Sequence, residues 1–165
     1  MARVICVPIF VILYYLDLNI WACIVFILAS VTDMLDGRIA RSRNMVTNFG
    51  KIMDPLADKV LVYSAFCLFV EKGIMPGWML MIILAREFAV SGMRTVAASQ
   101  GTVVAAGMTG KIKTVLQMFA VIFLLLKPYA NILDIIGQVL LWASLVMTIV
   151  SGAEYIIKNK NVFSM

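Results

Sequence analysis

Four aspartates stand close together in an otherwise apolar chain. Asp33 and Asp36 are three residues apart and Asp54 and Asp58 are four apart, so each pair shares one face of a helix. Carboxylates gathered in an apolar environment repel one another unless they are partly protonated or cations hold them together. Hard dications such as Mg²⁺ and Mn²⁺ bind oxygen ligands, and two such ions can clamp the oxygens of a phosphoryl displacement. The spacing therefore predicts a divalent-metal site that holds one ion or a pair and suits phosphoryl chemistry.

Small and basic residues accompany these aspartates. On a helical wheel the residues of the first face fall within about 140°: Asp33, Asp36, Gly37, Ala40 and Arg41. Gly50 stands four residues before Asp54 and shares its face. Small residues let a ligand approach the backbone, and an arginine binds phosphate through two parallel hydrogen bonds. Taken singly, these residues also suit helix packing, orientation charge or a proton relay, but together they favour a phosphate-ligand site.

A second group of charges lies further along the chain. Arg86 and Arg94 are eight residues apart, about 80° around one helix, so one cavity can hold both. Lys111 and Lys113 begin the next apolar segment. We predict that these four cations bind an anionic acceptor such as a phosphorylated polyol, and that Glu87 orients an arginine. A structural salt bridge for Glu87 and snorkelling for the lysines remain alternatives.

The composition indicates a membrane protein, so membrane helices must position the charged residues named above. Of the 165 residues, 63% are apolar, against about 45–50% in soluble domains. Six apolar segments can be drawn, at residues 3–16, 19–41, 54–71, 77–98, 110–127 and 131–157. We therefore predict an all-α integral membrane bundle of six transmembrane helices, forming a single domain over residues 1–165. Pro55 is expected in the first turn of the third helix, where no backbone donor is lost.

Several of these segments are apolar in one half only. If successive helices alternate in direction, the polar halves meet on one side, which predicts a polar cavity open to one face. With the N-terminus inside, only Lys72 and Lys127 fall outside, and twelve cations fall inside: Arg3, Arg38, Arg41, Arg43, Lys51, Lys59, Arg86, Arg94, Lys111, Lys113, Lys158 and Lys160. The cavity is therefore expected to face the cytoplasm.

The residue counts exclude several kinds of chemistry. The chain has no histidine, which removes Ser-His catalysis and histidine metal sites. The three cysteines, Cys6, Cys23 and Cys67, lie far apart in apolar runs, so neither a disulfide framework nor a thiolate metal site is expected. Acid–base and metal chemistry is left to carboxylates.

The aspartate pattern D-x-x-D-G-x-x-A-R, followed by G-x-x-x-D-x-x-x-D, resembles the signature of the CDP-alcohol phosphotransferase (phosphatidyltransferase) family at every fixed position. The resemblance implies that Asp33, Asp36 and Asp54 are metal ligands and that Asp58 completes the metal cluster and acts as general base. It also implies that Asp36, Gly37, Ala40, Arg41 and Gly50 bind the CDP-linked donor. The family resemblance further implies a multi-pass enzyme of the cell membrane, with its active site facing the cytoplasm, that forms a homodimer and releases CMP.

The patterns R-E-x-x-x-S-G-x-R from Arg86 and G-K-x-K-T from Gly110 resemble bacterial family members whose acceptor is sn-glycerol 3-phosphate. They imply phosphatidyl transfer from CDP-diacylglycerol to that acceptor, giving phosphatidylglycerol phosphate and CMP in phospholipid biosynthesis. Family members carry a short amphipathic stretch before the first helix, so we expect one to be missing here. The alternatives are another acceptor (inositol phosphate, serine or phosphatidylglycerol) or a divalent-cation transporter. No nucleic-acid partner is expected.

Overall fold

The structure is a computed structural model that describes residues 2–42, 48–99 and 107–158, with side chains over residues 6–32, 59–96 and 107–157. Every described residue in regular structure is helical. The elements are α1 (Ala2–Tyr15), α2 (Asn19–Ser42), α3 (Asn48–Glu71), α4 (Gly77–Ser99), α5 (Met108–Leu125), the 3₁₀ turn η1 (Lys127–Tyr129) and α6 (Asn131–Lys158). The predicted all-α bundle of six helices is confirmed.

The boundary of α3 differs from the sequence prediction. It begins at Asn48, six residues before the predicted start, whereas the other helices begin and end within two residues of their predicted positions. Residues 48–54 are helical although they include Asn48, Lys51 and Asp54, so the continuous apolar run that we used as the prediction covered only the later part of the helix. Pro55 therefore lies beyond the first turn of α3, and its expected placement there was wrong. Membrane helices tolerate such interior prolines because neighbouring groups satisfy the freed carbonyl.

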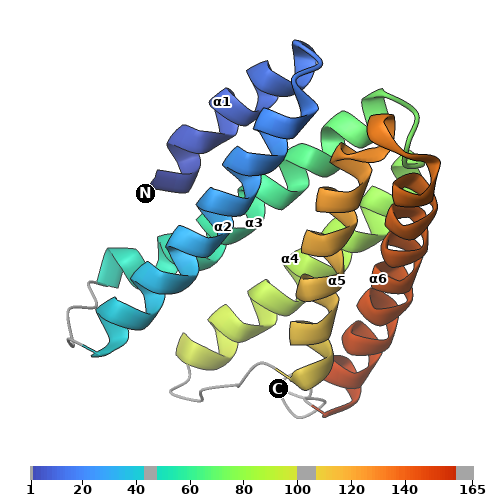
Figure 1. The fold of residues 1–165 in the computed structure, drawn as a ribbon. Coiled ribbons are helices and arrows are strands. Elements are labelled where there is room, and N and C mark those ends of the chain that lie inside the picture. The colour runs from blue at the N-terminus through green and yellow to red at the C-terminus, as the bar shows by residue number, and fades with distance from the viewer. Residues whose placement is uncertain (1, 43–47, 100–106, 159–165) are drawn as a thin grey trace.

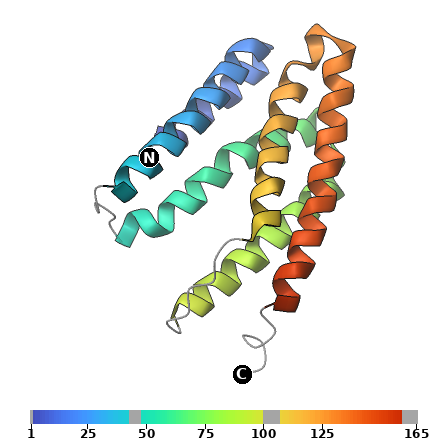
Figure 2. The same ribbon diagram turned by 60° about the horizontal axis from the view of Figure 1, so that its bottom comes forward.

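Successive helices run in opposite directions, as Figure 1 shows. The end of α2, the start of α3, the end of α4 and the start of α5 consequently lie at the same end of the bundle. These are the polar halves of the predicted segments, so the alternation that the sequence argument assumed is present. The turns between α1 and α2, between α3 and α4, and between α5 and α6 lie at the opposite end, called here the outer end (Figures 1 and 2).

The helices pack as two groups of three, which meet where α5 contacts α2 and α3 and where α4 contacts α3. Helix α1 packs against α2 and α3, with Phe10 and Phe26 fully buried and their ring centroids 6.1 Å apart. Helices α5 and α6 form the closest pair in the bundle. A Cβ at Gly137 of α6 would lie 2.8 Å from the Leu124 side chain of α5, so only glycine permits this approach. Small residues at a helix contact are typical of membrane bundles.

The surface of the bundle is apolar. Large hydrophobic side chains are exposed along the helices, for example Phe88 of α4 and, along α6, Ile135, Val139, Val146 and Ile157. Among the described helices, α5 (Met108–Leu125) and α6 (over Asn131–Ile157) are long and apolar enough to cross a membrane. A soluble domain does not expose contiguous apolar surface of this extent. The bundle is therefore that of a membrane protein.

Candidate active site

The two halves of the aspartate signature lie on neighbouring antiparallel helices. Asp33, Asp36, Gly37, Ala40 and Arg41 belong to the last turns of α2. Gly50, Asp54 and Asp58 belong to the first turns of α3. Helices α2 and α3 lie side by side at this end of the bundle in both views (Figures 1 and 2). The helical backbone thus brings both halves of the signature to one end of the molecule, and the side chains of these eight residues lie outside the described part of the structure.

The donor set fits a hard divalent cation. Two adjacent helices contribute four carboxylates, the chain contains no histidine, and its three cysteines lie in other parts of the bundle. Oxygen donors of this kind select Mg²⁺ or Mn²⁺ over softer metals. Among the described side chains no group of three potential ligands gathers elsewhere, so these aspartates remain the predicted metal ligands.

A cluster of charged residues surrounds Glu87 on α4. Lys59 of α3 places its Nζ 2.8 Å from Oε1 of Glu87, and Lys113 of α5 contacts Oε2 of the same carboxylate. Nη1 of Arg86 lies 3.4 Å from Oε2. Lys59 also donates a hydrogen bond to Oγ of Ser91 at 3.1 Å. We call Lys59, Arg86, Glu87 and Lys113 the Glu87 cluster. Three helices supply its members, and it holds one carboxylate among three cations.

The Glu87 cluster is largely removed from solvent. Glu87 is 8% exposed and Lys113 only 3% exposed. Buried charges of this kind persist only when they are paired, because an isolated charge loses its hydration. Among the described side chains one carboxylate pairs with three cations, so two positive charges remain in excess within the cluster. A cluster of this charge is compatible with an anionic ligand.

Within this cluster Arg86 is the cation with the longest contact to Glu87. Its Nε is buried and has no hydrogen-bond partner among the described residues, and its contact with Glu87 is long. A guanidinium presents five donors in a planar fork. Nη2 of Arg86 lies near Gly110 in the first turn of α5, 3.6 Å from the position that a Cβ of Gly110 would take. The N-cap residue of α5, Gly107, provides no side-chain cap. The positive end of the α5 dipole therefore adds to the attraction for an anion.

Two of the predicted acceptor residues lie apart from this cluster. Arg94 stands two turns further along α4, and its Cζ lies 5.6 Å from the ring centroid of Tyr155 on α6. Lys111 is exposed. The structure thus groups Arg86 and Lys113 around Glu87 and leaves Arg94 and Lys111 nearer the end of the bundle. Their role in acceptor binding remains a prediction.

Sequence reasoning missed Lys59 as a member of the site. It follows Asp58 directly, so α3 carries the predicted base and a cation of the Glu87 cluster on consecutive residues. The sequence argument also missed the hydrogen bond from Thr109 Oγ1 to Glu154 Oε2, 2.8 Å long, which joins the start of α5 to the end of α6. Both contacts depend on helix packing, for which a single sequence carries no signal.

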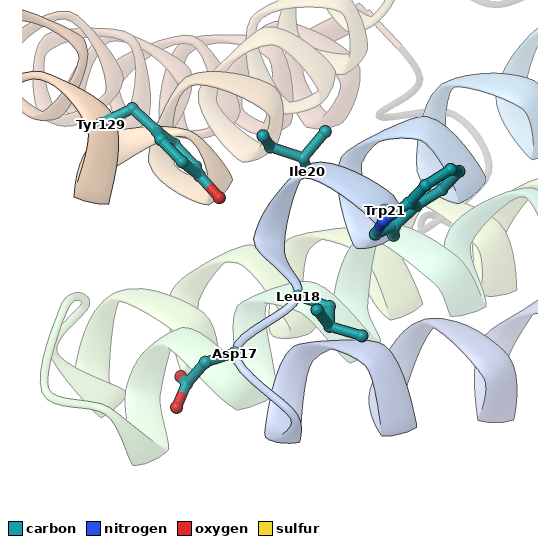
Figure 3. A pocket seen from close by; sticks show the side chains of 5 residues that line it. All are labelled: Asp17, Leu18, Ile20, Trp21 and Tyr129. Carbon is teal, nitrogen blue, oxygen red and sulfur yellow. The ribbon is translucent and has the colours of Figure 1, made fainter.

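A pocket of about 400 Å³ lies at the outer end of the bundle and has a different character. It is lined by Asp17, Leu18, Ile20 and Trp21 from the start of α2 and the turn before it, and by Tyr129 of η1 (Figure 3). Asp17 adopts a left-handed backbone conformation there, with φ of 56°. None of the predicted site residues lines this pocket, so we do not assign it to the active site.

Comparison with known proteins relates the chain to one family. The CDP-alcohol phosphatidyltransferase family matches residues 1–150. A Bacillus subtilis protein named CDP-diacylglycerol–glycerol-3-phosphate 3-phosphatidyltransferase is 50% identical over 138 residues, covering 82% of this chain and 72% of the relative. A Rickettsia typhi protein of the same name is 38% identical over 168 residues, covering 98% and 94%. A Mycobacterium tuberculosis protein, named as a probable phosphatidylglycerophosphate synthase, is 36% identical over 136 residues, covering 82% and 63%.

Proposed function

Because the chain belongs to the CDP-alcohol phosphatidyltransferase family, we propose that it transfers the phosphatidyl group of CDP-diacylglycerol to sn-glycerol 3-phosphate. The products are phosphatidylglycerol phosphate and CMP. The relatives from Bacillus subtilis and Rickettsia typhi are named for this reaction. The structural observation that supports the acceptor is the Glu87 cluster, which has two positive charges in excess and begins at the residue after Asp58.

The donor is assigned to the junction of α2 and α3. Asp33, Asp36, Asp54 and Asp58 would hold the divalent metal, Mg²⁺ or Mn²⁺ as a pair of ions. When bound, the metal would supply positive charge for the donor pyrophosphate and for the charge that develops on CMP. The CDP pocket is lined by the small residues and the arginine of the signature: Gly37, Ala40, Arg41 and Gly50. Small side chains allow the nucleotide to approach the helix backbone, and the guanidinium pairs with a phosphate.

The reaction itself requires one proton transfer and one displacement. Asp58 accepts the proton of the acceptor hydroxyl as the hydroxyl oxygen attacks the phosphorus that carries the diacylglycerol. A new phosphorus–oxygen bond forms to the acceptor, and the bond from that phosphorus to the CMP oxygen breaks. A carboxylate is a weak base, so its placement against the hydroxyl contributes more than its basicity.

The acceptor phosphate is assigned to the Glu87 cluster. A phosphate monoester carries about −1.5 to −2 charges at neutral pH, which matches the excess of positive charge there. Arg86 is the main ligand, because it lies in the Glu87 cluster and its Nε has no protein partner among the described residues; Nε of Arg94 is likewise unpartnered there, but Arg94 stands two turns further along α4. Glu87 orients Arg86 and the two lysines, and Arg94 and Lys111 extend the positive field toward the cytoplasm. An acceptor of zero net charge, such as zwitterionic serine, does not offset the excess positive charge of these cations.

The membrane supplies the donor. The exposed apolar faces of the helices contact lipid, so the acyl chains of CDP-diacylglycerol remain in the bilayer while its headgroup enters the polar half of the bundle. The excess of lysine and arginine in this half supports the proposal that it faces the cytoplasm from the cell membrane. We include a homodimer in the proposal on the basis of the family resemblance.

An acceptor panel tests the proposal. CMP release from CDP-diacylglycerol is measured in detergent with Mg²⁺ or Mn²⁺ and with glycerol 3-phosphate, inositol phosphate, serine, glycerol or phosphatidylglycerol. We expect release with glycerol 3-phosphate alone, and its loss in Asp58→Asn. Asp17→Asn is the matched control, because this carboxylate lies at the outer end and asparagine tolerates its left-handed backbone. Preference for another acceptor contradicts the substrate assignment, and equal loss in both variants contradicts the role of Asp58.

A further inference from the structure

The Arg86 side chain passes between glycines of two other helices. A Cβ at Gly152 of α6 would stand 3.0 Å from Cγ of Arg86 and 4.0 Å from its Nε. A Cβ at Gly110 of α5 would stand 3.6 Å from Nη2 of the same side chain. The stem of the arginine thus lies against one glycine and its guanidinium against the other. The Arg86 side chain is only 13% exposed, so it has little space in which to adopt another course.

We propose that Gly152, assisted by Gly110, is a positioning residue for acceptor binding, because its missing side chain fixes the course of Arg86 toward the acceptor phosphate. This inference rests on the proposed function, in which Arg86 is the main phosphate ligand. Gly152 itself touches no substrate. It acts by determining where the guanidinium stands relative to the Glu87 cluster.

The surroundings of Gly152 distinguish this role from ordinary helix packing. Outside its own helix, and among the described residues, the heavy atoms found within 4 Å of its ideal Cβ belong to the Arg86 side chain. At Gly137, on the same helix, the nearest atoms belong to Leu124 and include its backbone nitrogen at 3.1 Å. Gly137 therefore permits two helices to approach, whereas Gly152 provides space for one side chain. Glycine in a helix costs about 1 kcal/mol relative to alanine, so an exchange to alanine gains helix propensity at both sites.

The position of Gly152 on the arginine stem amplifies a small displacement. A contact of 3.0 Å is tighter than most methyl contacts in proteins, so an alanine requires Cγ of Arg86 to give way by a few tenths of an ångström. The guanidinium lies further along the side chain, and a rotation near Cγ moves it by more than Cγ itself moves. Charge-assisted hydrogen bonds depend on donor position and angle. A substitution at Gly152 is therefore expected to weaken acceptor binding more than catalysis.

The test compares Gly152→Ala with two other glycine-to-alanine variants. Gly77→Ala at the start of α4 meets only Val70 at an ordinary 3.7 Å, and Gly137→Ala strains the contact between α5 and α6. We expect Gly152→Ala to raise KM for glycerol 3-phosphate about tenfold, as when one hydrogen bond to a charged group is weakened. The KM for CDP-diacylglycerol and kcat should change less than about twofold. Both control variants should keep the wild-type KM, and Gly137→Ala should lower only thermal stability.

A second measurement requires no activity. The thermal midpoint is measured in detergent for wild type, Gly152→Ala, Arg86→Ala and the double variant. We expect Gly152→Ala to lower the midpoint in the wild-type background and not in the Arg86→Ala background, because the clashing side chain is then absent. Additive effects, or a KM as low as that of Gly77→Ala, overturn the inference while leaving the proposed function intact. Absence of glycerol 3-phosphate transfer by the wild-type protein overturns the proposed function instead, and the stability cycle still decides whether Gly152 positions Arg86.

Discussion

Substitution of Glu87 by glutamine tests the organisation of the Glu87 cluster. The amide keeps the shape of the carboxylate, but it removes the negative charge that three cations share. It also turns one of the two oxygens into a donor facing an ammonium group. Lys113, only 3% exposed, then remains buried without a carboxylate partner among the described side chains. Such a charge must lose its proton, draw in water or move, and each of these destabilises the packed bundle.

The expected loss follows from the burial of the partners. Breaking a buried ion pair by removing one member costs about 3–5 kcal/mol, because the other charge stays buried. The side chain of Lys59 is 33% exposed and can turn toward water, so we reduce this cost to about 2–3 kcal/mol, at and below the lower end of that range. A protein of this length loses about 2–4 °C of thermal midpoint per kcal/mol. Glu87→Gln should therefore lower the midpoint by about 4–12 °C.

The assay is thermal unfolding of purified protein in one detergent, followed by circular dichroism. Glu71→Gln is the matched control, because Glu71 is exposed at the outer end and accepts a hydrogen bond from Tyr15. It should change the midpoint by less than about 2 °C. In Glu87→Gln with Lys113→Met both charges are gone, and replacement of a buried pair by neutral side chains is often tolerated. The double variant should therefore be more stable than Glu87→Gln alone. A midpoint of Glu87→Gln equal to that of the control, or additive losses in the double variant, would refute the reasoning.

Three further predictions concern the acceptor, the helix contact and the metal. Arg86→Lys should raise KM for glycerol 3-phosphate about tenfold in initial-rate kinetics, because an ammonium cannot form the paired hydrogen bonds of a guanidinium; an unchanged KM would contradict the assignment of Arg86. Gly137→Ala should destabilise the bundle by about 1–3 kcal/mol, since its Cβ would lie 2.8 Å from Leu124, and a thermal midpoint equal to that of wild type would contradict the close packing of α5 and α6. Chelation by EDTA should abolish CMP release and added Mg²⁺ or Mn²⁺ should restore it, whereas activity that survives exhaustive chelation would contradict a metal site.

The fold was predictable because hydropathy reports membrane depth. Apolar runs bounded by turn residues predicted six helices, and the structure places their ends close to the predicted positions. The start of α3 was the exception, since a helix can continue through polar residues once it leaves the apolar layer or faces a polar interior. Phe49, Ile52 and Met53 are apolar at helical spacing, but Asn48, Gly50 and Lys51 lie among them. A search for continuous apolar runs therefore passed over this first part of α3.

The candidate site was predictable only in part. The aspartate signature is local, with fixed spacing on two consecutive helices, so its residues could be named from the sequence. The Glu87 cluster joins α3, α4 and α5 through side chains that are distant in the chain, and nothing in a single sequence pairs Lys59 with Glu87. Gly152 was equally hidden, because a glycine in a membrane helix usually indicates close helix packing. Its contact with Arg86 becomes visible only when α4 and α6 are placed together.

The most direct test of the central claim is the identity of the lipid product. The purified protein is incubated in detergent with CDP-diacylglycerol, Mg²⁺ and glycerol 3-phosphate that carries ¹³C in all carbons, and the lipids are analysed by mass spectrometry. We predict a new lipid that retains the whole labelled glycerol and its phosphate, formed in equal amount to CMP. Formation of CMP without a labelled lipid, or no reaction by folded protein with metal present, would contradict the proposed phosphatidyl transfer to glycerol 3-phosphate.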